Sequence, residues 1–317
     1  MWFSIYGYDM VNGDDVAVLI PTRNGGEVFQ QAIEALQAQT LRPARVIVVD
    51  TQSSDGTPER AQAAGYTVHG IVKKDFDHGG TRQYLAALAA PLPILVYLTQ
   101  DAVLDSPDAL ATLVAFLRED NRLGAAGGRQ LPHHDANPLA IHHRAFNYPA
   151  QSAIRTAADI PSLGMRAAFL SDAFAAYRRK ALEAVGGFPS PVLFGEDMQV
   201  AAKMLTKDFA VGYCAVAAVR HSHNYNMMED FRRSVDIGAM HTGTPWLRDT
   251  LGGAEGEGLR FVRSEAAWLL RHHPLWLIPA ALHTAAKLLG YKLGQRAQML
   301  PKKWIRACSM NKGWWGI

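Results

Sequence analysis

The sequence is poor in several features that would define its class at once. Among its 317 residues there are only two cysteines, Cys214 and Cys308, too few for a disulfide framework or a cysteine-rich zinc site. We therefore expect two unpaired thiols in a reducing compartment. The charge excess is also small, with 32 Lys and Arg residues against 29 Asp and Glu residues, and it gives no argument for nucleic-acid binding.

Long apolar runs and a secretory signal are missing as well. The N-terminus lacks the basic segment, apolar core and small-residue cleavage site of a signal peptide. The most apolar late segment, residues 274–282, is far shorter than the roughly 20 residues that a bilayer crossing needs. These features predict a cytosolic protein and leave a peripheral position on a membrane open.

What the chain does contain is a series of short apolar runs, each followed by polar residues. They cover residues 16–20, 46–50, 67–72 and 95–98, and helical patterns separate them. Such alternation predicts right-handed βαβ units and an α/β fold with a mostly parallel sheet. Later segments predict a helix over 107–119, a strand and a mixed region over 124–162, a helix from Glu196, a strand over 211–219 and a helix from about Met228.

Polar side chains follow the predicted strands where each strand ends. Residues 22–24, Asp50, residues 78–82 and Asp101 should meet at the carboxyl edge of the sheet, where α/β proteins bind ligands. Neither a Gly-x-Gly-x-x-Gly turn nor a P-loop is present, so the crevice relies on carboxylates and arginines. If the ligand is a nucleotide, an aspartate beside its phosphates predicts a divalent metal between them, because Mg²⁺ and Mn²⁺ prefer oxygen ligands. The alternative for Asp101 is a residue that caps a helix or ends a strand.

Four pieces of sequence now point to a family. Ile20-Pro-Thr-Arg-Asn24, Val49-Asp-Thr-Gln-Ser-Ser-Asp-Gly-Thr57, Thr99-Gln-Asp101 and Gly195-Glu-Asp197 together resemble the signature of glycosyltransferase family 2, over about residues 16–245. The resemblance implies the GT-A fold, a Rossmann-like sheet flanked by helices, with a C-terminal helical extension. Residues 76–82, 98–102 and 221–225 are most similar to rhamnosyltransferases that build O-antigen or other bacterial surface polysaccharides from dTDP-L-rhamnose.

The resemblance also implies roles for individual residues. Asp50 is expected to hydrogen-bond the pyrimidine base, and Asp101 is expected to hold Mg²⁺ or Mn²⁺ on the diphosphate of the donor. The nucleotide-sugar site is expected to include Asp50 and Asp101 together with Pro21, Thr22, Arg23, Arg82 and Gln100.

The sequence departs from the commoner family pattern at the metal motif. The first carboxylate of the usual Asp-x-Asp motif is replaced, leaving Thr99-Gln100-Asp101, and Thr51 stands where a second aspartate often follows Asp50. His221 comes directly after a predicted strand, and imidazole binds Mn²⁺, so we expect His221 to be a further metal ligand. The alternative is a turn histidine bonded to backbone.

Asp197 is the expected catalytic base. An inverting transfer needs one group to take the proton of the attacking acceptor hydroxyl, and a positioned carboxylate can do so. The resemblance places Asp197 in that role, with Glu196 orienting the acceptor or supporting Asp197. The alternative is that both are charges that favour a helix N-terminus. Arg82 and Arg220 are candidates for stabilising the leaving diphosphate.

These features predict an inverting, metal-assisted glycosyltransferase that moves a sugar, with L-rhamnose from dTDP-L-rhamnose as the first expectation, onto a lipid-linked glycan at the inner face of the cytoplasmic membrane. Two alternatives remain: transfer of another sugar from a UDP or dTDP donor, and a nucleotide-sugar-binding protein without turnover. We expect a domain over 1–249, with a nucleotide-binding half over about 16–105 and an acceptor half over about 125–245.

A glycine-rich linker over 250–258 is expected to lead into a C-terminal helical region over 259–317 that is rich in basic and aromatic residues. This mixture suits the headgroup region of a membrane. The alternative is a helical hairpin that packs on its own domain or on a partner subunit.

Overall fold

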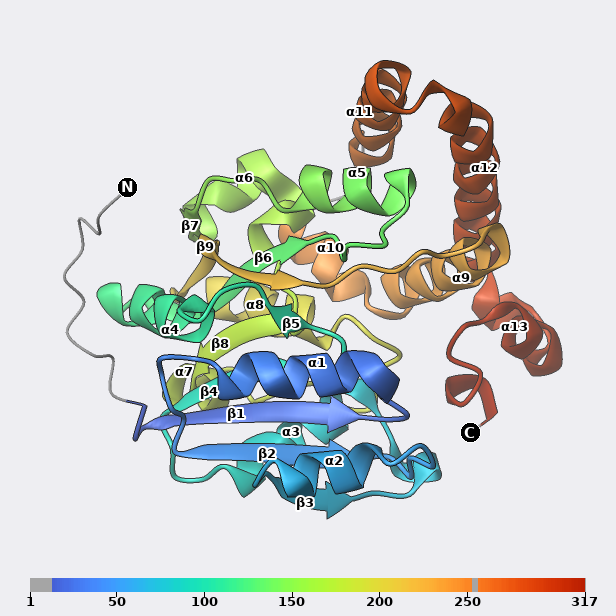
Figure 1. The fold of residues 1–317 in the computed structure, drawn as a ribbon. Helices are drawn as coiled ribbons and strands as arrows, with labels where there is room; N and C mark the ends of the chain where they lie inside the picture. Colours follow the sequence, from blue (N-terminus) through green and yellow to red (C-terminus); the bar gives the residue numbers. More distant parts are fainter. Residues whose placement is uncertain (1–12, 253–255, 317) are drawn as a thin grey trace.

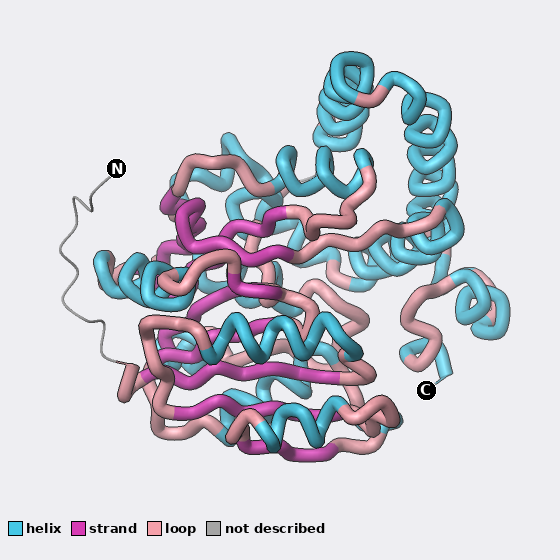
Figure 2. The backbone as a smooth tube through the Cα atoms, in the orientation of Figure 1, coloured by secondary structure: helices cyan, strands magenta, loops and turns pink. Residues whose placement is uncertain are grey.

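A mixed β-sheet crosses the molecule, with helices on both of its faces (Figure 1, Figure 2). The computed structural model describes residues 13–252 and 256–316. In this part of the chain the strand order is β3-β2-β1-β4-β8-β6-β9-β5, and β7 pairs with β9. The strands are β1 (Val16–Thr22), β2 (Arg45–Asp50), β3 (Thr67–Gly70), β4 (Ile94–Leu98), β5 (Val103–Leu104), β6 (Leu123–Leu131), β7 (Ala153–Arg155), β8 (Phe174–Arg178) and β9 (Ala210–Arg220).

The first four strands form the parallel part of the sheet, as the alternation of strands and helices predicted. Along β1, Ala17 and Leu19 enter one core while Val16, Val18 and Ile20 enter the other. Because both faces are buried, the strand reads as a continuous apolar run. Helices α1, α2 and α4 cover one face, and α3, α7 and α8 cover the other (Figure 1).

The helices of the described residues are α1 (Gly26–Gln37), α2 (Thr57–Ala63), α3 (His78–Leu88), α4 (Ala109–Glu119), α5 (Pro138–Asn147), α6 (Ile160–Leu163), α7 (Arg179–Ala184), α8 (Glu196–Leu205), α9 (Met227–Gly243), α10 (Pro245–Leu251), α11 (Glu257–His272), α12 (Leu277–Gly294) and α13 (Lys302–Cys308).

Strand β8 makes the sheet mixed, and the sequence did not predict it. It lies antiparallel between β4 and β6, with Phe174 opposite Leu98 and Ala175 opposite both Tyr97 and Gly127. The run direction of β8 brings the loop before it to the same edge of the sheet as the carboxyl end of β4. Residues of that loop therefore join the residues that follow β1, β2 and β4.

Strands β5, β6 and β9 bring further residues to the same edge of the sheet. Val103 of β5 pairs with Arg220 of β9, so the residues just before Val103 lie beside the residues just after Arg220. Strand β9 also runs parallel to β6, which ends at Leu131 opposite Arg220. This pairing brings Asp101 and His221, 120 positions apart in the chain, to neighbouring places.

The C-terminal helices pack on the domain that precedes them. Helix α12 packs against α9, and α11 contacts α5 (Figure 1). The predicted linker, residues 250–258, overlaps both neighbouring helices, since α10 ends at Leu251 and α11 begins at Glu257. Residues 253–255 of the predicted linker fall outside the described part of the chain. Within the described ranges, no helix combines the length and apolar character required for a bilayer crossing.

Candidate active site

The loop after β1 is held by the loop after β2. The N–H groups of Asn24, Gly25 and Gly26 donate to side chains of Ser53, Thr57 and Asp55, at 2.7–2.8 Å. Asp55 also accepts from the hydroxyl of Thr57 at 2.6 Å, and its pKa lies below the usual range, chiefly because of that bond. The polar motif after β2 thus shapes the neighbouring loop.

Asp50 ends β2 beside these loops and is almost fully buried. Its Oδ1 accepts from the hydroxyls of Thr22, at 3.0 Å, and Ser53, at 2.5 Å, and its Oδ2 accepts from the backbone N–H of Ser53 at 2.9 Å. Thr22 stands directly opposite Asp50 in the register of β1 and β2, and Pro21 stands opposite Val49. The residues predicted to bind the nucleotide are therefore brought together.

Gln100, the residue before Asp101, bonds the loop after β1. Its Oε1 accepts from the N–H of Arg23 at 2.7 Å, and its Nε2 donates to the carbonyl of Arg23 at 3.0 Å. An amide can make both bonds at once, whereas a carboxylate can only accept. Gln100 therefore ties the end of β4 to the loop after β1 and leaves Asp101 as the carboxylate of this turn.

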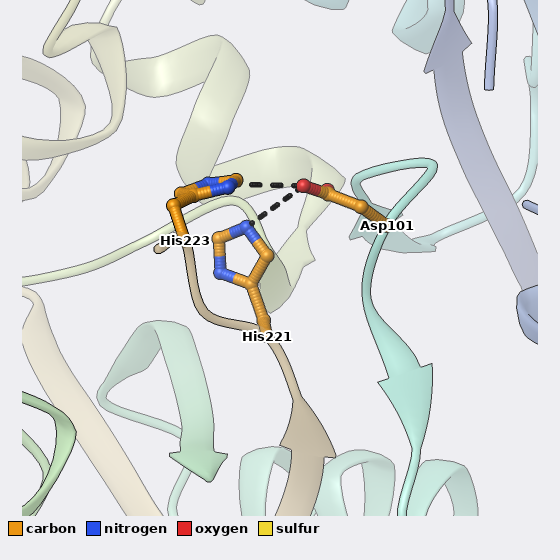
Figure 3. A group of neighbouring side chains, drawn as sticks. All are labelled: Asp101, His221 and His223. Carbon is orange, nitrogen blue, oxygen red and sulfur yellow. Dashed lines mark ion pairs between the residues drawn. The ribbon is translucent and has the colours of Figure 1, made fainter. Parts of the chain in front are cut away.

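Asp101 faces two histidines (Figure 3). Its Oδ2 lies 3.4 Å from Nε2 of His221 and 3.7 Å from Nε2 of His223. One ligand atom from each of the three residues falls within 4.8 Å of the others, an arrangement that can hold a metal ion. His223 was not predicted. The signal that could have found it was the His-x-His spacing after β9, because alternate residues of an extended segment point the same way.

The hydrogen-bond network sets which nitrogen of His221 carries the proton. Arg144, which can only donate, bonds Oε1 of Gln130 at 2.8 Å, so that atom is the amide oxygen. The same oxygen lies 2.9 Å from Nδ1 of His221, which must therefore be the donor. Nε2 is then the ring nitrogen that faces Asp101 and could bind a metal. A bond of this kind to the second ring nitrogen is typical of histidines that bind metals.

The pKa values of Asp101 and His223 are both lowered, so neither group holds a proton that a cation would have to displace near neutral pH. Burial opposes ionisation of Asp101, but His221, His223 and Thr99 together outweigh it and hold the pKa of Asp101 well below its usual range. Burial and the neighbouring His221 lower the pKa of His223 to about 4. Near neutral pH the cluster therefore presents an anionic carboxylate and an unprotonated His223 imidazole.

A second cluster surrounds Asp197 at the start of α8. Gly195, at the N-cap, has a φ of 78°, a left-handed conformation that glycine adopts most easily, and it turns the chain into the helix. Asp197 Oδ1 accepts from the N–H of Met198 at 2.7 Å, and Oδ2 accepts from the N–H of Asp172 at 3.2 Å. Both bonds orient the Asp197 carboxylate.

Arg82 joins the acidic residues of this cluster. Its Nε lies 2.8 Å from Oδ2 of Asp172, and its Nη1 lies 2.8 Å from Oε1 of Glu196; all three side chains are buried. The Tyr177 hydroxyl donates to Oδ1 of Asp172 at 2.5 Å. The expected place of Arg82 in the nucleotide pocket stays a prediction, whereas its ion pairs tie α3 to α8. Asp172 was missed because β8 was missed.

The pKa values in this cluster shift upward. Burial raises the pKa of Asp197, and the adjacent Glu196 carboxylate adds to the rise, while Arg82 and the two N–H donors oppose it. Burial likewise raises the pKa of Asp172, against the effect of Arg82. A carboxylate whose pKa approaches neutral is a stronger base than an ordinary aspartate while it remains deprotonated.

A chain of contacts links the two clusters. Gln130, which bonds His221, donates from Nε2 to the hydroxyl of Ser171 at 2.9 Å, and the next residue, Asp172, donates its N–H to Asp197. Arg220 lies outside this chain, since its Nε pairs with Asp105 at 2.8 Å. The metal-type cluster and the acidic cluster are therefore connected by one path of hydrogen bonds through Gln130, Ser171 and Asp172.

Comparison with known proteins decides the family. The model for glycosyl transferase family 2 matches residues 17–186, more than half of the chain. This protein belongs to glycosyl transferase family 2. Its similarity to curated members extends further: it is 44% identical over 301 residues to the O-antigen chain rhamnosyltransferase RfbN of Salmonella typhimurium, covering 95% of this chain and 96% of that protein. It is also 44% identical over 299 residues to the O-antigen chain rhamnosyltransferase WbaN of Salmonella anatum, covering 94% and 95%.

Solved structures agree with the predicted GT-A fold of this glycosyltransferase. A mannosyltransferase from Pyrobaculum calidifontis, in complex with GDP-Man and Mn²⁺, has a TM-score of 0.57 at 20% identity and covers 95% of this chain and 87% of its own. Glucosyl-3-phosphoglycerate synthase from Mycobacterium tuberculosis, in complex with Mn²⁺, UDP-glucose and glycerol 3-phosphate, has a TM-score of 0.54 at 18% identity, with coverages of 81% and 88%. The predicted fold class is confirmed.

The donor atoms of this glycosyltransferase fit a divalent metal. One carboxylate oxygen and two imidazole nitrogens suit Mn²⁺, because Mg²⁺ prefers oxygen ligands alone. The expected ligands Asp101 and His221 lie together, and His223 adds a third. Glu196 and Asp197, the residues of the family motif, lie in the buried acidic cluster at the start of α8, and their catalytic roles stay predictions.

Proposed function

We propose that this glycosyltransferase moves L-rhamnose from dTDP-L-rhamnose onto a hydroxyl of a growing O-antigen-type glycan, with inversion at the anomeric carbon. The observation that carries the chemistry is the single site in which Asp101, His221 and His223 are connected through Gln130 and Ser171 to Asp197. The choice of rhamnose is supported by the two rhamnosyltransferases that match almost the full chain.

The donor side of the site lies at the ends of β1, β2 and β4. Thr22 bonds Asp50 there, and Gln100 bonds the backbone of Arg23, which follows Pro21 and Thr22 in the chain. Asp101, His221 and His223 would hold the metal, with Mn²⁺ favoured by the nitrogen ligands. When bound, such an ion stabilises negative charge on the leaving diphosphate.

Asp197 acts on the acceptor. Its carboxylate takes the proton of the acceptor hydroxyl as that oxygen bonds to the anomeric carbon of the donor. The bond from the anomeric carbon to the phosphate oxygen breaks, and its electron pair leaves with the nucleoside diphosphate. The N–H groups of Met198 and Asp172 keep the carboxylate in place, and Glu196 and Arg82 supply the charged surroundings that set its pKa.

We further propose that the acceptor is a lipid-linked glycan and that the protein works peripherally at the cytoplasmic face of the membrane. Cys214 and Cys308 are both free thiols, as expected for a reducing compartment. A lipid-linked acceptor requires the site to lie near a bilayer, and the C-terminal region described in the next subsection is suited to that position.

A panel of donors tests the proposal. Purified protein would be mixed with dTDP-L-rhamnose, UDP-glucose, UDP-N-acetylglucosamine or GDP-mannose, with Mn²⁺, Mg²⁺ or EDTA, and thermal stabilisation and sugar transfer would be followed together. We expect the largest stabilisation and transfer with dTDP-L-rhamnose and Mn²⁺. Stabilisation by another donor alone would replace rhamnose by that sugar, and donor binding without transfer to any acceptor would indicate a nucleotide-sugar-binding protein.

A further inference from the structure

One side of α12 packs against α9. Gly290 and Gly294 lie so close to α9 that a side chain at either position would overlap the backbone carbonyl groups of Phe231 and Val235. Gly238 of α9 makes the same kind of close approach to the backbone of α12 at Tyr291. Because backbones meet directly at these glycines, the orientation of α12 on the domain is fixed, and so is the side that it turns outward.

The outward side of α12 is apolar and uncovered. We call it the outer face of α12 and define it by its exposed large apolar residues, together with one from the turn that precedes the helix. Leu275 is 90% exposed and Ile278 75% exposed. The members are Leu275, Ile278, Leu282, Leu288 and Leu289. Leu275, Ile278 and Leu282 are spaced by three and four residues and Leu289 follows two turns later, so these four lie in one stripe, with Leu288 at its edge.

The stripe continues into cations and an exposed tryptophan. Lys292 and Arg296 follow Leu289 at the same helical spacing, and Met299, Lys303 and Trp304 come next, all of them exposed. Residues 266–317 contain eight Lys and Arg residues and no Asp or Glu, whereas the rest of the chain carries all 29 acidic residues. An apolar stripe, cations and an interfacial tryptophan are the features of a helix that lies in a membrane surface.

We propose that the outer face of α12, with Lys292, Arg296 and the segment from Met299 to Trp304, docks on a membrane that carries anionic lipids. This inference rests on the proposed function, in which the acceptor is lipid-linked. Charge favours lipid over a second copy of the chain, because two copies joined through this face would bring like charges together. The apolar side chains enter the acyl boundary, and the Lys and Arg side chains meet the lipid phosphates.

The docking surface has a rigid connection to the site. Helix α9, on which α12 rests, starts at Met227, four residues after His223, and its N-cap Asn226 accepts from the N–H groups of Met228 and Glu229. In Figure 1, α9 and α12 lie beyond the end of the sheet to which the arrow of β1 points, and this is the edge that carries the site. A bilayer held on α12 is thus kept in a fixed relation to the site.

Vesicle flotation tests the docking. Full-length protein would be mixed with vesicles of phosphatidylcholine alone, or of phosphatidylcholine with roughly one-third phosphatidylglycerol, an anionic lipid that attracts Lys and Arg side chains. We expect flotation with the anionic vesicles and its reduction at high salt. The triple variant Ile278→Glu/Leu282→Glu/Leu289→Glu should lose at least about tenfold in partition, since three inserted side chains become charged. Val216→Glu is the matched control, because Val216 is 74% exposed on β9, away from this face.

A charge variant and an activity measurement separate the outcomes. Lys292→Glu/Arg296→Glu should weaken binding to anionic vesicles while leaving the apolar stripe intact. Both variants should keep wild-type transfer to a water-soluble acceptor and lose transfer to a lipid-linked acceptor in vesicles. Flotation that is absent in the wild type, or unchanged in the triple variant, overturns the docking proposal even if transfer is normal. Transfer that is absent with every acceptor overturns the proposed function while the flotation result still stands.

Light scattering tests whether a second copy of the chain, rather than a membrane, covers the outer face of α12. If the outer face of α12 joined two copies of the chain, the wild type would be dimeric and the triple variant monomeric, with no flotation in either. That result would also overturn the docking proposal. Circular dichroism of each variant confirms folding, and all the substituted side chains are exposed, so loss of the core is not expected.

Discussion

The pKa values of two aspartates in this molecule, Asp101 and Asp197, are shifted in opposite directions. Asp101 faces His221 and His223, and its pKa lies below the usual range. Asp197 is next to Glu196 in a buried acidic cluster, and its pKa lies above it. The side chains are chemically identical, so the difference comes from their neighbours. An aspartate that stays ionised is suited to hold a cation, and one that is easily protonated is suited to accept a proton.

The strongest way to break this comparison is to remove the proposed base. Asp197→Asn keeps the shape of the side chain but cannot take a proton, so we expect transfer to fall by about 10²–10⁴-fold, the usual effect of a general base. Donor binding, measured by calorimetry, should remain near the wild-type value. Asp208→Asn is the control, because Asp208 is exposed just beyond the far end of the same helix and has a φ of 61° that Asn also tolerates. Near-normal transfer in Asp197→Asn would remove Asp197 from the mechanism.

The second test concerns the cation site. His223→Ala removes a ligand that the sequence did not suggest, and Asp101→Asn removes its only carboxylate. We expect the Mn²⁺ dissociation constant to rise by at least about 100-fold in each, because losing a ligand should cost more than the roughly 10–100-fold that follows from losing the hydrogen-bond partner of a ligand. Mn²⁺ titration followed by electron paramagnetic resonance gives the affinity. His134→Ala serves as a control from outside the three-residue cluster. Unchanged Mn²⁺ affinity in both variants would place the metal elsewhere.

A smaller effect is expected from the residue that orients His221. Gln130→Leu removes the oxygen that accepts from Nδ1 of His221, so the ring can take the tautomer that protonates Nε2. Mn²⁺ affinity should fall by about tenfold, as is usual for a partner of a metal ligand. Gln130→Glu keeps an acceptor at this place and should recover most of the affinity. A Glu variant as weak as the Leu variant would mean that Gln130 acts through packing alone.

The smallest expected effect is a pH shift. Activity needs deprotonated Asp197, so it should be lost as pH falls through the raised pKa of this carboxyl. Glu196→Gln removes a negative neighbour, which lowers the pKa of Asp197 and moves the acidic limb of kcat/KM to lower pH. The shift is measured by comparing kcat/KM of the wild type and of Glu196→Gln between pH 4 and 8, about two units on each side of the expected acidic limb. A limb that moves to higher pH would show that Glu196 does not raise this pKa.

Much of the parallel half of the fold was predictable from residue pattern. Strands β1, β2 and β4 are β-branched or apolar runs buried on both faces, and their ends carry the polar residues of the site. Strand β8 was not predictable in this way. Its sequence, Phe174-Ala-Ala-Tyr-Arg178, contains two alanines, which favour helix, and it is a strand because it fits between β4 and β6. Its omission also hid Asp172.

The sequence by itself determined the polar residues that follow the first strands, including Asp101, the motif Gly195-Glu-Asp197, and the composition of a basic C-terminal region. These are local properties, set by residue type and spacing. Only the tertiary structure decided that His223 joins Asp101, that Gln130 links His221 to the acidic cluster, and that Arg82 pairs with Asp172 and Glu196. It also decided which side of α12 is outward. Those contacts join residues that are tens to more than one hundred positions apart, and they follow from strand order and helix packing, which no local pattern specifies.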